Sequence, residues 1–106
     1  MTYLQTLKQA AIKMYKLPDN VQEYSRTKVF STQSVPTGLL NDHSTKEGVW
    51  GRLVVDAGQI LYTITEPGEE ESMILEQHQD AVIAPTQLHK VELLTPDTEF
   101  HVEFMK

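Results

Sequence analysis

Histidine is the residue type in this chain with the clearest potential for chemistry. The sequence contains His43, His78, His89 and His101, and it contains no cysteine. A neutral imidazole ligates divalent metals and exchanges protons near neutral pH. The lack of cysteine excludes disulfides, thiolate ligands and cysteine-based redox chemistry. Of the motifs that mark common enzyme sites, the sequence has no GxSxG, no phosphate-binding glycine loop and no HExxH.

His43 belongs to a polar group of side chains. If residues 39–45 are extended, the period of two places Asn41, His43 and Thr45 on one face. Three polar side chains that face the same way are typical of a ligand pocket rather than of a core. The alternative is a loop histidine near the mouth of the fold, and the residues alone leave both interpretations open.

His89 follows the apolar run 81–84 and shares a strand face with Val91. If Val91 faces the core, His89 faces it too. A buried imidazole needs partners for its two nitrogens. Those partners are a metal, a side chain or water, and the local sequence does not choose among them.

The remaining histidines have weaker indications of function. His101 lies on a strand whose apolar residues face the other way, so it is expected at the surface beside Glu99 and Glu103 unless the strand bulges. His78 lies in a polar turn. Arg52 is expected to pair with a carboxylate such as Glu103.

The pattern of the chain predicts a short helix followed by a single β domain. Residues 1–16 have apolar side chains at helical spacing and form an expected N-terminal amphipathic helix. Residues 17–106 form the expected single domain, with short strands at regular spacing, which is typical of an antiparallel sandwich or barrel. The predicted strands are 27–32, 39–45, 49–55, 59–65, 72–75, 81–84, 90–94 and 99–105.

Composition limits the classes of partner and compartment. The chain has 106 residues and a formal net charge of −6. That charge argues against nucleic acid as a partner, because phosphate contacts need a basic face. No apolar run approaches the roughly 20 residues that a membrane helix needs. Neither a membrane nor a signal-peptide pattern is found, so a cytoplasmic location is expected.

Two stretches resemble a known family. Residues 38–55, GLLNDHSTKEGVWGRLVV, together with residues 84–89 and 100–104, are similar to the N-terminal domain of the tellurite-resistance protein TehB and to its YeaR-like relatives. The resemblance covers residues 17–106. Such full-length tellurite-resistance proteins also carry an S-adenosylmethionine-dependent methyltransferase domain, and methyltransferase activity is not expected of this chain.

The resemblance implies a small cupin, which is an antiparallel β-barrel of the jelly-roll type. Cupins commonly hold a divalent metal through histidines of two motifs, so His43 and His89 become the expected ligands of zinc, iron, nickel or manganese. The chain departs from the general cupin pattern at Thr45 and Gly51, which stand near the places of a second histidine and a glutamate. The implied site is therefore more open than a four-ligand site.

The function that follows is a binding module for a metal, a small ligand or an oxyanion, in tellurite resistance or a stress response. Asn41, Thr45 and Lys46 are the local residues expected to line its pocket. The alternative is a metal-dependent enzyme of the dioxygenase or isomerase kind, which a third protein ligand would favour. A homodimer is expected, because exposed strand edges and the N-terminal helix offer surfaces for pairing.

Overall fold

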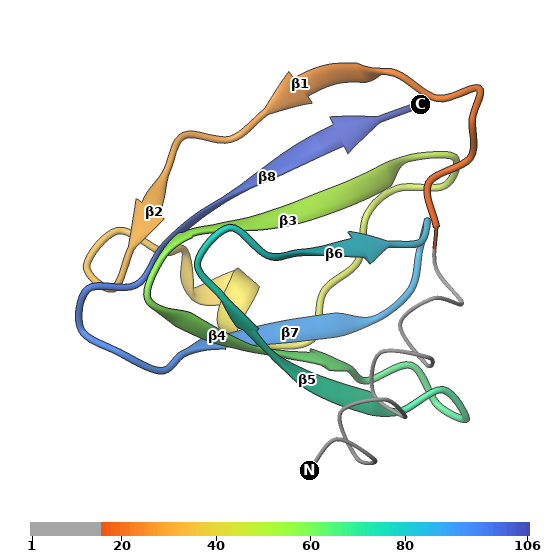
Figure 1. Cartoon of the computed structure of the whole chain (residues 1–106). Helices are drawn as coiled ribbons and strands as arrows, with labels where there is room; N and C mark the ends of the chain where they lie inside the picture. Colours follow the sequence, from red (N-terminus) through yellow and green to blue (C-terminus); the bar gives the residue numbers. More distant parts are fainter. Residues whose placement is uncertain (1–15) are drawn as a thin grey trace, which may run out of the picture.

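A computed structural model of the chain describes residues 16–106, which form eight strands and one short 3₁₀ helix (Figure 1). The helix predicted for residues 1–16 falls almost wholly outside this part and stays a prediction. The strands are β1 (Glu23–Arg26), β2 (Phe30–Ser31), β3 (Trp50–Ala57), β4 (Gln59–Ile64), β5 (Glu71–Glu76), β6 (Asp80–Ile83), β7 (His89–Leu93) and β8 (Glu99–Met105), and the 3₁₀ helix is η1 (Thr37–Leu40).

The strands make two antiparallel sheets. The larger has the order β1-β8-β3-β6, with β2 also pairing with β8, and the smaller has the order β5-β4-β7. The mainly β prediction is confirmed. The closed barrel is wrong, because the two sheets remain separate in the described part of the chain.

The segment before β3 explains why the sheets stay apart. The strand predicted for residues 39–45 is replaced at its start by η1, where Leu39 N–H donates to the carbonyl of Pro36 at 3.0 Å. Pro36 has its φ fixed near −64°, which favours a turn at this point. The segment then makes a single bridge with β7, at His43. One bridge does not close a barrel.

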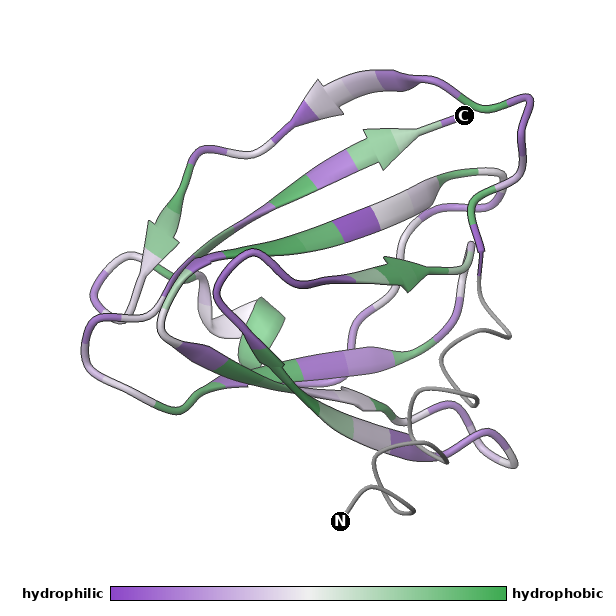
Figure 2. Ribbon diagram, viewed as in Figure 1, coloured by the Kyte–Doolittle hydropathy of each residue, from purple (hydrophilic) through white to green (hydrophobic). Residues whose placement is uncertain are grey.

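The core follows the period of two along the strands. On β3 and β4 every second residue is buried, and Figure 2 shows a continuous hydrophobic stretch within β3. These inward side chains meet between the two sheets. β1, which the sequence did not predict, is exposed throughout and forms by pairing with β8. The core consists of Phe30, Leu53, Val55, Ile60, Tyr62, Ile64, Leu75, Ala81, Ile83, Val91, Phe100 and Val102.

No helix in the described residues has both the length and the apolar character needed to cross a membrane.

Candidate metal and ligand site

His43 and His89 lie side by side. Each donates its backbone N–H to the other's carbonyl, at 3.0 Å from His43 and 2.9 Å from His89. Residues that exchange both bonds in an antiparallel bridge send their side chains to the same face. The two imidazole rings accordingly have centroids 4.0 Å apart. The structure thus brings together the two histidines named from the sequence.

Both rings are oriented by backbone carbonyls. Nδ1 of His43 lies 3.1 Å from the carbonyl oxygen of Asn41, and Nδ1 of His89 lies 2.9 Å from that of Gln87. A carbonyl only accepts, so Nδ1 carries the proton in each neutral ring. Nε2 of each ring is left with its lone pair. A histidine that donates Nδ1–H to a carbonyl is oriented in the way common for metal ligands.

The environment of His89 keeps it uncharged. The residue is 1% exposed. Burial lowers the pKa of His89 to about 4, and the neighbouring His43 acts in the same direction, while the hydrogen bond to Gln87 opposes it. The ring is therefore neutral at physiological pH, which is the form that binds a metal.

Of the three residues expected to line the pocket, one lines the cavity and two do not. Thr45 lines the cavity, where its hydroxyl donates to the Val49 carbonyl at 2.7 Å and accepts from Thr86 N–H at 3.3 Å. Asn41 is exposed and donates its side-chain amide to the Thr37 carbonyl, so its part at the site is the carbonyl that orients His43. Lys46 is exposed, and it is not among the residues that line the cavity.

A cavity of about 360 Å³ extends from the histidines between the two sheets. Its walls come from both sheets and from the segment that contains η1. Among the described residues, no third His, Cys, Asp or Glu joins the pair in a group able to hold a metal. The cavity is lined by Thr27, Phe30, Pro36, Gly38, Leu39, His43, Ser44, Thr45, Leu53, Ile83, His89, Val91, Phe100, Val102 and Phe104.

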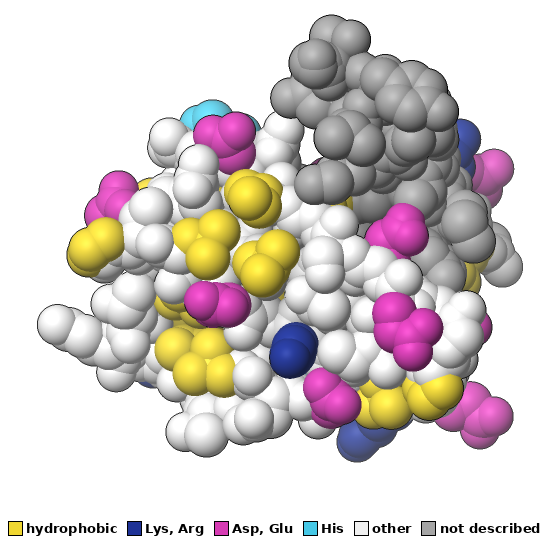
Figure 3. Space-filling view, turned by 90° about the horizontal axis from the view of Figure 1, so that it is seen from below, with side chains coloured by type: hydrophobic (Ala, Val, Ile, Leu, Met, Phe, Trp, Pro, Cys, Tyr) yellow, Lys and Arg dark blue, Asp and Glu magenta, His cyan; other side chains and the backbone are white. Residues whose placement is uncertain are grey.

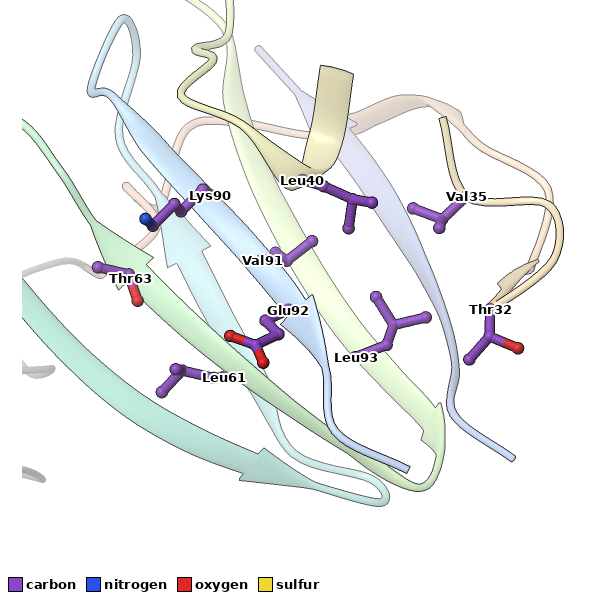
Figure 4. A pocket seen from close by; sticks show the side chains of 9 residues that line it. All are labelled: Thr32, Val35, Leu40, Leu61, Thr63, Lys90, Val91, Glu92 and Leu93. Atoms are coloured by element: carbon purple, nitrogen blue, oxygen red, sulfur yellow. The ribbon is translucent and has the colours of Figure 1, made fainter. Parts of the chain in front are cut away.

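A second hollow, of about 540 Å³, lies over β4 and β7 (Figure 4). Leu40 and Val35 stand on one side of it and Leu61 and Thr63 on the other, with β7 between them. It includes neither His43 nor His89, and we assign the candidate site to the inner cavity. The lining of the hollow is Thr32, Val35, Leu40, Leu61, Thr63, Lys90, Val91, Glu92 and Leu93.

His101 belongs to a separate polar cluster on the outer face of the larger sheet. Its Nδ1 lies 2.8 Å from a carboxylate oxygen of Asp56, and its Nε2 lies 2.9 Å from one of Glu103. The prediction that His101 would be a surface residue is wrong, since the residue is only 9% exposed. Its predicted neighbour Glu103 does lie beside it. Arg52 Nη1 lies 3.7 Å from Glu103, which confirms that predicted pairing. His78 lies in a turn, as predicted, and is exposed.

Asp56 was not among the candidate residues, because the strand predicted for residues 49–55 ends one residue before it, whereas β3 runs to Ala57. The signal that could have found it is the alternation along β3: Arg52 and Asp56 occupy the face opposite Leu53 and Val55. Burial opposes a charge on His101, but the two carboxylates outweigh it, so the pKa of His101 is raised.

Comparison with known proteins places this chain in a family. The family described as the TehB-like domain matches residues 25–102. The chain belongs to this family. It is 30% identical over 100 residues to the uncharacterized protein YeaR of Escherichia coli (strain K12), covering 86% of this chain and 82% of that protein.

Two further similarities agree with this assignment. The chain is 31% identical over 84 residues to TehB of Haemophilus influenzae (strain 10810), named as a probable S-adenosyl-L-methionine-dependent methyltransferase, with 76% of this chain and 29% of that protein covered. A crystal structure of a protein from Escherichia coli (strain K12) superimposes with a TM-score of 0.78 at 29% identity, covering 88% of this chain and 97% of that one.

Proposed function

We propose that this protein binds a divalent metal through Nε2 of His43 and Nε2 of His89. The observation that carries the proposal is the pair of Nδ1 contacts, at 3.1 and 2.9 Å, to the carbonyls of Asn41 and Gln87. They orient two imidazoles whose centroids are 4.0 Å apart, with Nε2 of each ring left to bind a ligand. Zinc, iron, nickel or manganese would accept such ligands.

The same contacts favour a metal over an oxyanion. An anion needs hydrogen-bond donors, whereas a neutral ring whose Nδ1 is protonated presents an acceptor at Nε2. Lys46, the cation closest in sequence to His43, is not among the cavity-lining residues. We therefore propose a metal, rather than an oxyanion, as the species bound at the two histidines.

Binding rather than catalysis is the function that the site supports best. A third protein ligand would have favoured a dioxygenase- or isomerase-like activity, and the described residues offer no such group. Two protein ligands leave most coordination positions to water or to a small molecule. Such a site suits an exchangeable metal whose remaining coordination positions hold water or a small molecule.

We also propose that the fold is a cupin jelly roll with one incomplete strand. A jelly roll is a long antiparallel hairpin folded over on itself, so that its outer strands pair first and the pairs nest inward. Here β1 pairs with β8, β3 with β6 and β4 with β5. The bridge between His43 and β7 supplies the missing pair of this series.

The cellular role follows only from the family. We propose a cytoplasmic module in tellurite resistance or a stress response. Support comes from the match to the TehB-like domain and from the similarity to TehB of Haemophilus influenzae.

A homodimer is the assembly that we propose. Ile74 of β5 is 49% exposed on the outer face of the smaller sheet, since the next residue, Leu75, faces the core. Figure 3 shows apolar side chains gathered on this face, between single acidic and basic ones. β5, which contains Ile74, forms one edge of the same sheet. An apolar face beside an exposed strand edge is a common pairing surface.

Calorimetric titration of chelator-treated protein with Zn²⁺ tests metal binding. One ion per chain is expected for the wild type and for His78→Ala, whose imidazole is exposed and distant in sequence from the site. His43→Ala and His89→Gln should each abolish stoichiometric binding. Equal binding by all four proteins, with circular dichroism showing each of them folded, would overturn the proposal.

A further inference from the structure

The walls of the inner cavity are almost wholly apolar. Leu53, Ile83 and Phe100 come from the larger sheet and Val91 from the smaller one. None of the described residues that line the cavity is Asp, Glu, Lys or Arg. The cavity is therefore an opening into the hydrophobic interior of the sandwich, and its polar side chains are those of Thr27, His43, Ser44, Thr45 and His89.

The apolar walls determine which class of molecule the cavity can bind. A cavity of about 360 Å³ is within the range of small-molecule sites. Apolar cavities of roughly 150 Å³ hold benzene and stay free of water because they offer no hydrogen bonds. A charged molecule would lose its hydration here without gaining a partner. The walls therefore favour an uncharged, mostly apolar molecule.

The polar end sets the orientation of that molecule. His43 and His89 both line the cavity, and their Nδ1 atoms are engaged by backbone carbonyls. The groups left to meet a guest are Nε2 lone pairs, which accept hydrogen bonds or bind a metal. Ser44 and Thr45, the two residues that follow His43, also line the cavity.

We propose that the cavity binds a small, uncharged, predominantly apolar molecule whose polar group, a hydroxyl or similar donor, faces His43 and His89. The proposal rests on the proposed function for its polar end, because the Nε2 atoms that would meet the donor are those that would hold the metal. If a metal is bound, the polar group of the guest would face it in place of the two Nε2 atoms.

Phenol is the probe for this site, and benzoate is its charged counterpart. Titration of the full, chelator-treated chain with phenol, followed by amide NMR, should give saturable shifts at Leu53, Val91 and Val102. Benzoate should bind at least about tenfold more weakly, since its carboxylate has no partner on the apolar walls. Benzoate binding as tightly as phenol would overturn the proposal.

Two neighbouring leucines provide matched variants. Leu39 is half-buried and lines the inner cavity, whereas Leu40 is exposed and lines the outer hollow. Leu39→Trp should fill the cavity and weaken phenol binding by at least about tenfold, and Leu40→Trp should leave it unchanged. Phe104→Trp, at another half-buried lining position, serves if Leu39→Trp does not fold. A folded Leu39→Trp, or Phe104→Trp in its place, that binds phenol as tightly as Leu40→Trp does would contradict the assignment of the phenol site to the inner cavity.

Repeating the phenol titration on zinc-loaded protein separates this inference from the metal proposal. Phenol shifts at the cavity walls without any zinc uptake would leave the ligand inference standing and overturn the metal proposal. Zinc uptake without phenol shifts at the walls would overturn the ligand inference alone.

Discussion

His43 and His89 are joined by a closed pair of backbone hydrogen bonds, and their imidazole rings lie 4.0 Å apart on the same face of that bridge. The bridge joins the segment after η1 to the first residue of β7. It fixes the separation of the two side chains through the backbone, so the pair does not depend on a metal for its assembly. A site formed in this way is preorganised for binding.

The burial of His89 should make the protein sensitive to acid. Above pH 6.5 the ring is neutral in both the folded and the unfolded chain. Burial lowers the pKa of His89 to about 4 in the folded chain. As the pH falls from 6.5 towards 4, the unfolded chain therefore binds a proton at His89 that the folded chain does not bind, and the folded state loses stability. The full effect is roughly 3 kcal/mol of unfolding free energy.

Urea unfolding of metal-free protein at pH 7 and pH 4.5 measures this loss. His89→Gln should lose less stability than the wild type over the same interval, because it removes the titrating ring. Parallel losses in both proteins would show that His89 is not the cause.

The His101 cluster should have the opposite pH dependence. Burial disfavours its charge, but hydrogen bonds to Asp56 and Glu103 raise the pKa of His101 above the usual 6.5. The stabilisation is fully present below pH 6.5 and is lost as the pH rises through the raised value. Unfolding experiments at pH 6 and pH 9 should show this loss in the wild type and a smaller loss in His101→Gln. The exposed His78→Gln variant should follow the wild type, and a different course would point to another group.

Gly58 should be irreplaceable at the turn between β3 and β4. Its φ is +75°, and a Cβ there would lie 2.5 Å from the hydroxyls of Thr95 and Thr98 and 2.6 Å from Cα of Thr98. Thr98 is fully buried, and its hydroxyl donates to the Gln59 carbonyl at 3.1 Å. Gly58→Ala therefore combines backbone strain with a clash against the backbone.

Gly68 supplies the control for that substitution. Its φ is +83°, but an added Cβ would meet nothing within 4 Å. Gly68→Ala should cost only the left-handed strain, about 1 kcal/mol, and Gly58→Ala should cost clearly more. Thermal or urea unfolding measures both, and equal losses would mean that the close contact of Gly58 with Thr98 is easily relieved.

The proposed dimer should depend on the apolar outer face of the smaller sheet. Ile74→Lys places a charge where an exposed isoleucine lies, and Ser72→Lys adds the same charge two residues earlier on the same face of β5. Light scattering at micromolar concentration should give a dimer for the wild type and a monomer for Ile74→Lys, with Ser72→Lys less affected. A monomeric wild type would contradict the dimer.

Much of the fold could be predicted from alternation alone. β3, β4 and β8 have near-continuous alternating or buried patterns, and their predicted ranges agree with the structure to within two residues. η1 and β1 could not be found in this way. η1 depends on a turn set by Pro36, and β1 has four exposed residues that are ordered by pairing with β8.

In the candidate site, too, some features could be predicted from the local sequence pattern and others depend on tertiary placement. His89 could be placed toward the core because it shares a face with Val91, and both are buried. The bridge to His43 depends on tertiary placement of the segment after η1, which period-two reasoning does not give. The role of Asn41 lies in its backbone carbonyl, which side-chain chemistry does not reveal.

The metal content of the protein as purified is the most direct test of the central claim. Wild type, His43→Ala/His89→Gln and His78→Ala would be isolated without chelator and without a metal-affinity tag, and then analysed by elemental mass spectrometry. The account predicts close to one divalent metal per chain in the wild type and in His78→Ala, and none in the double variant. Wild-type protein that is free of metal and takes up none on titration, or a double variant that retains metal, would contradict it.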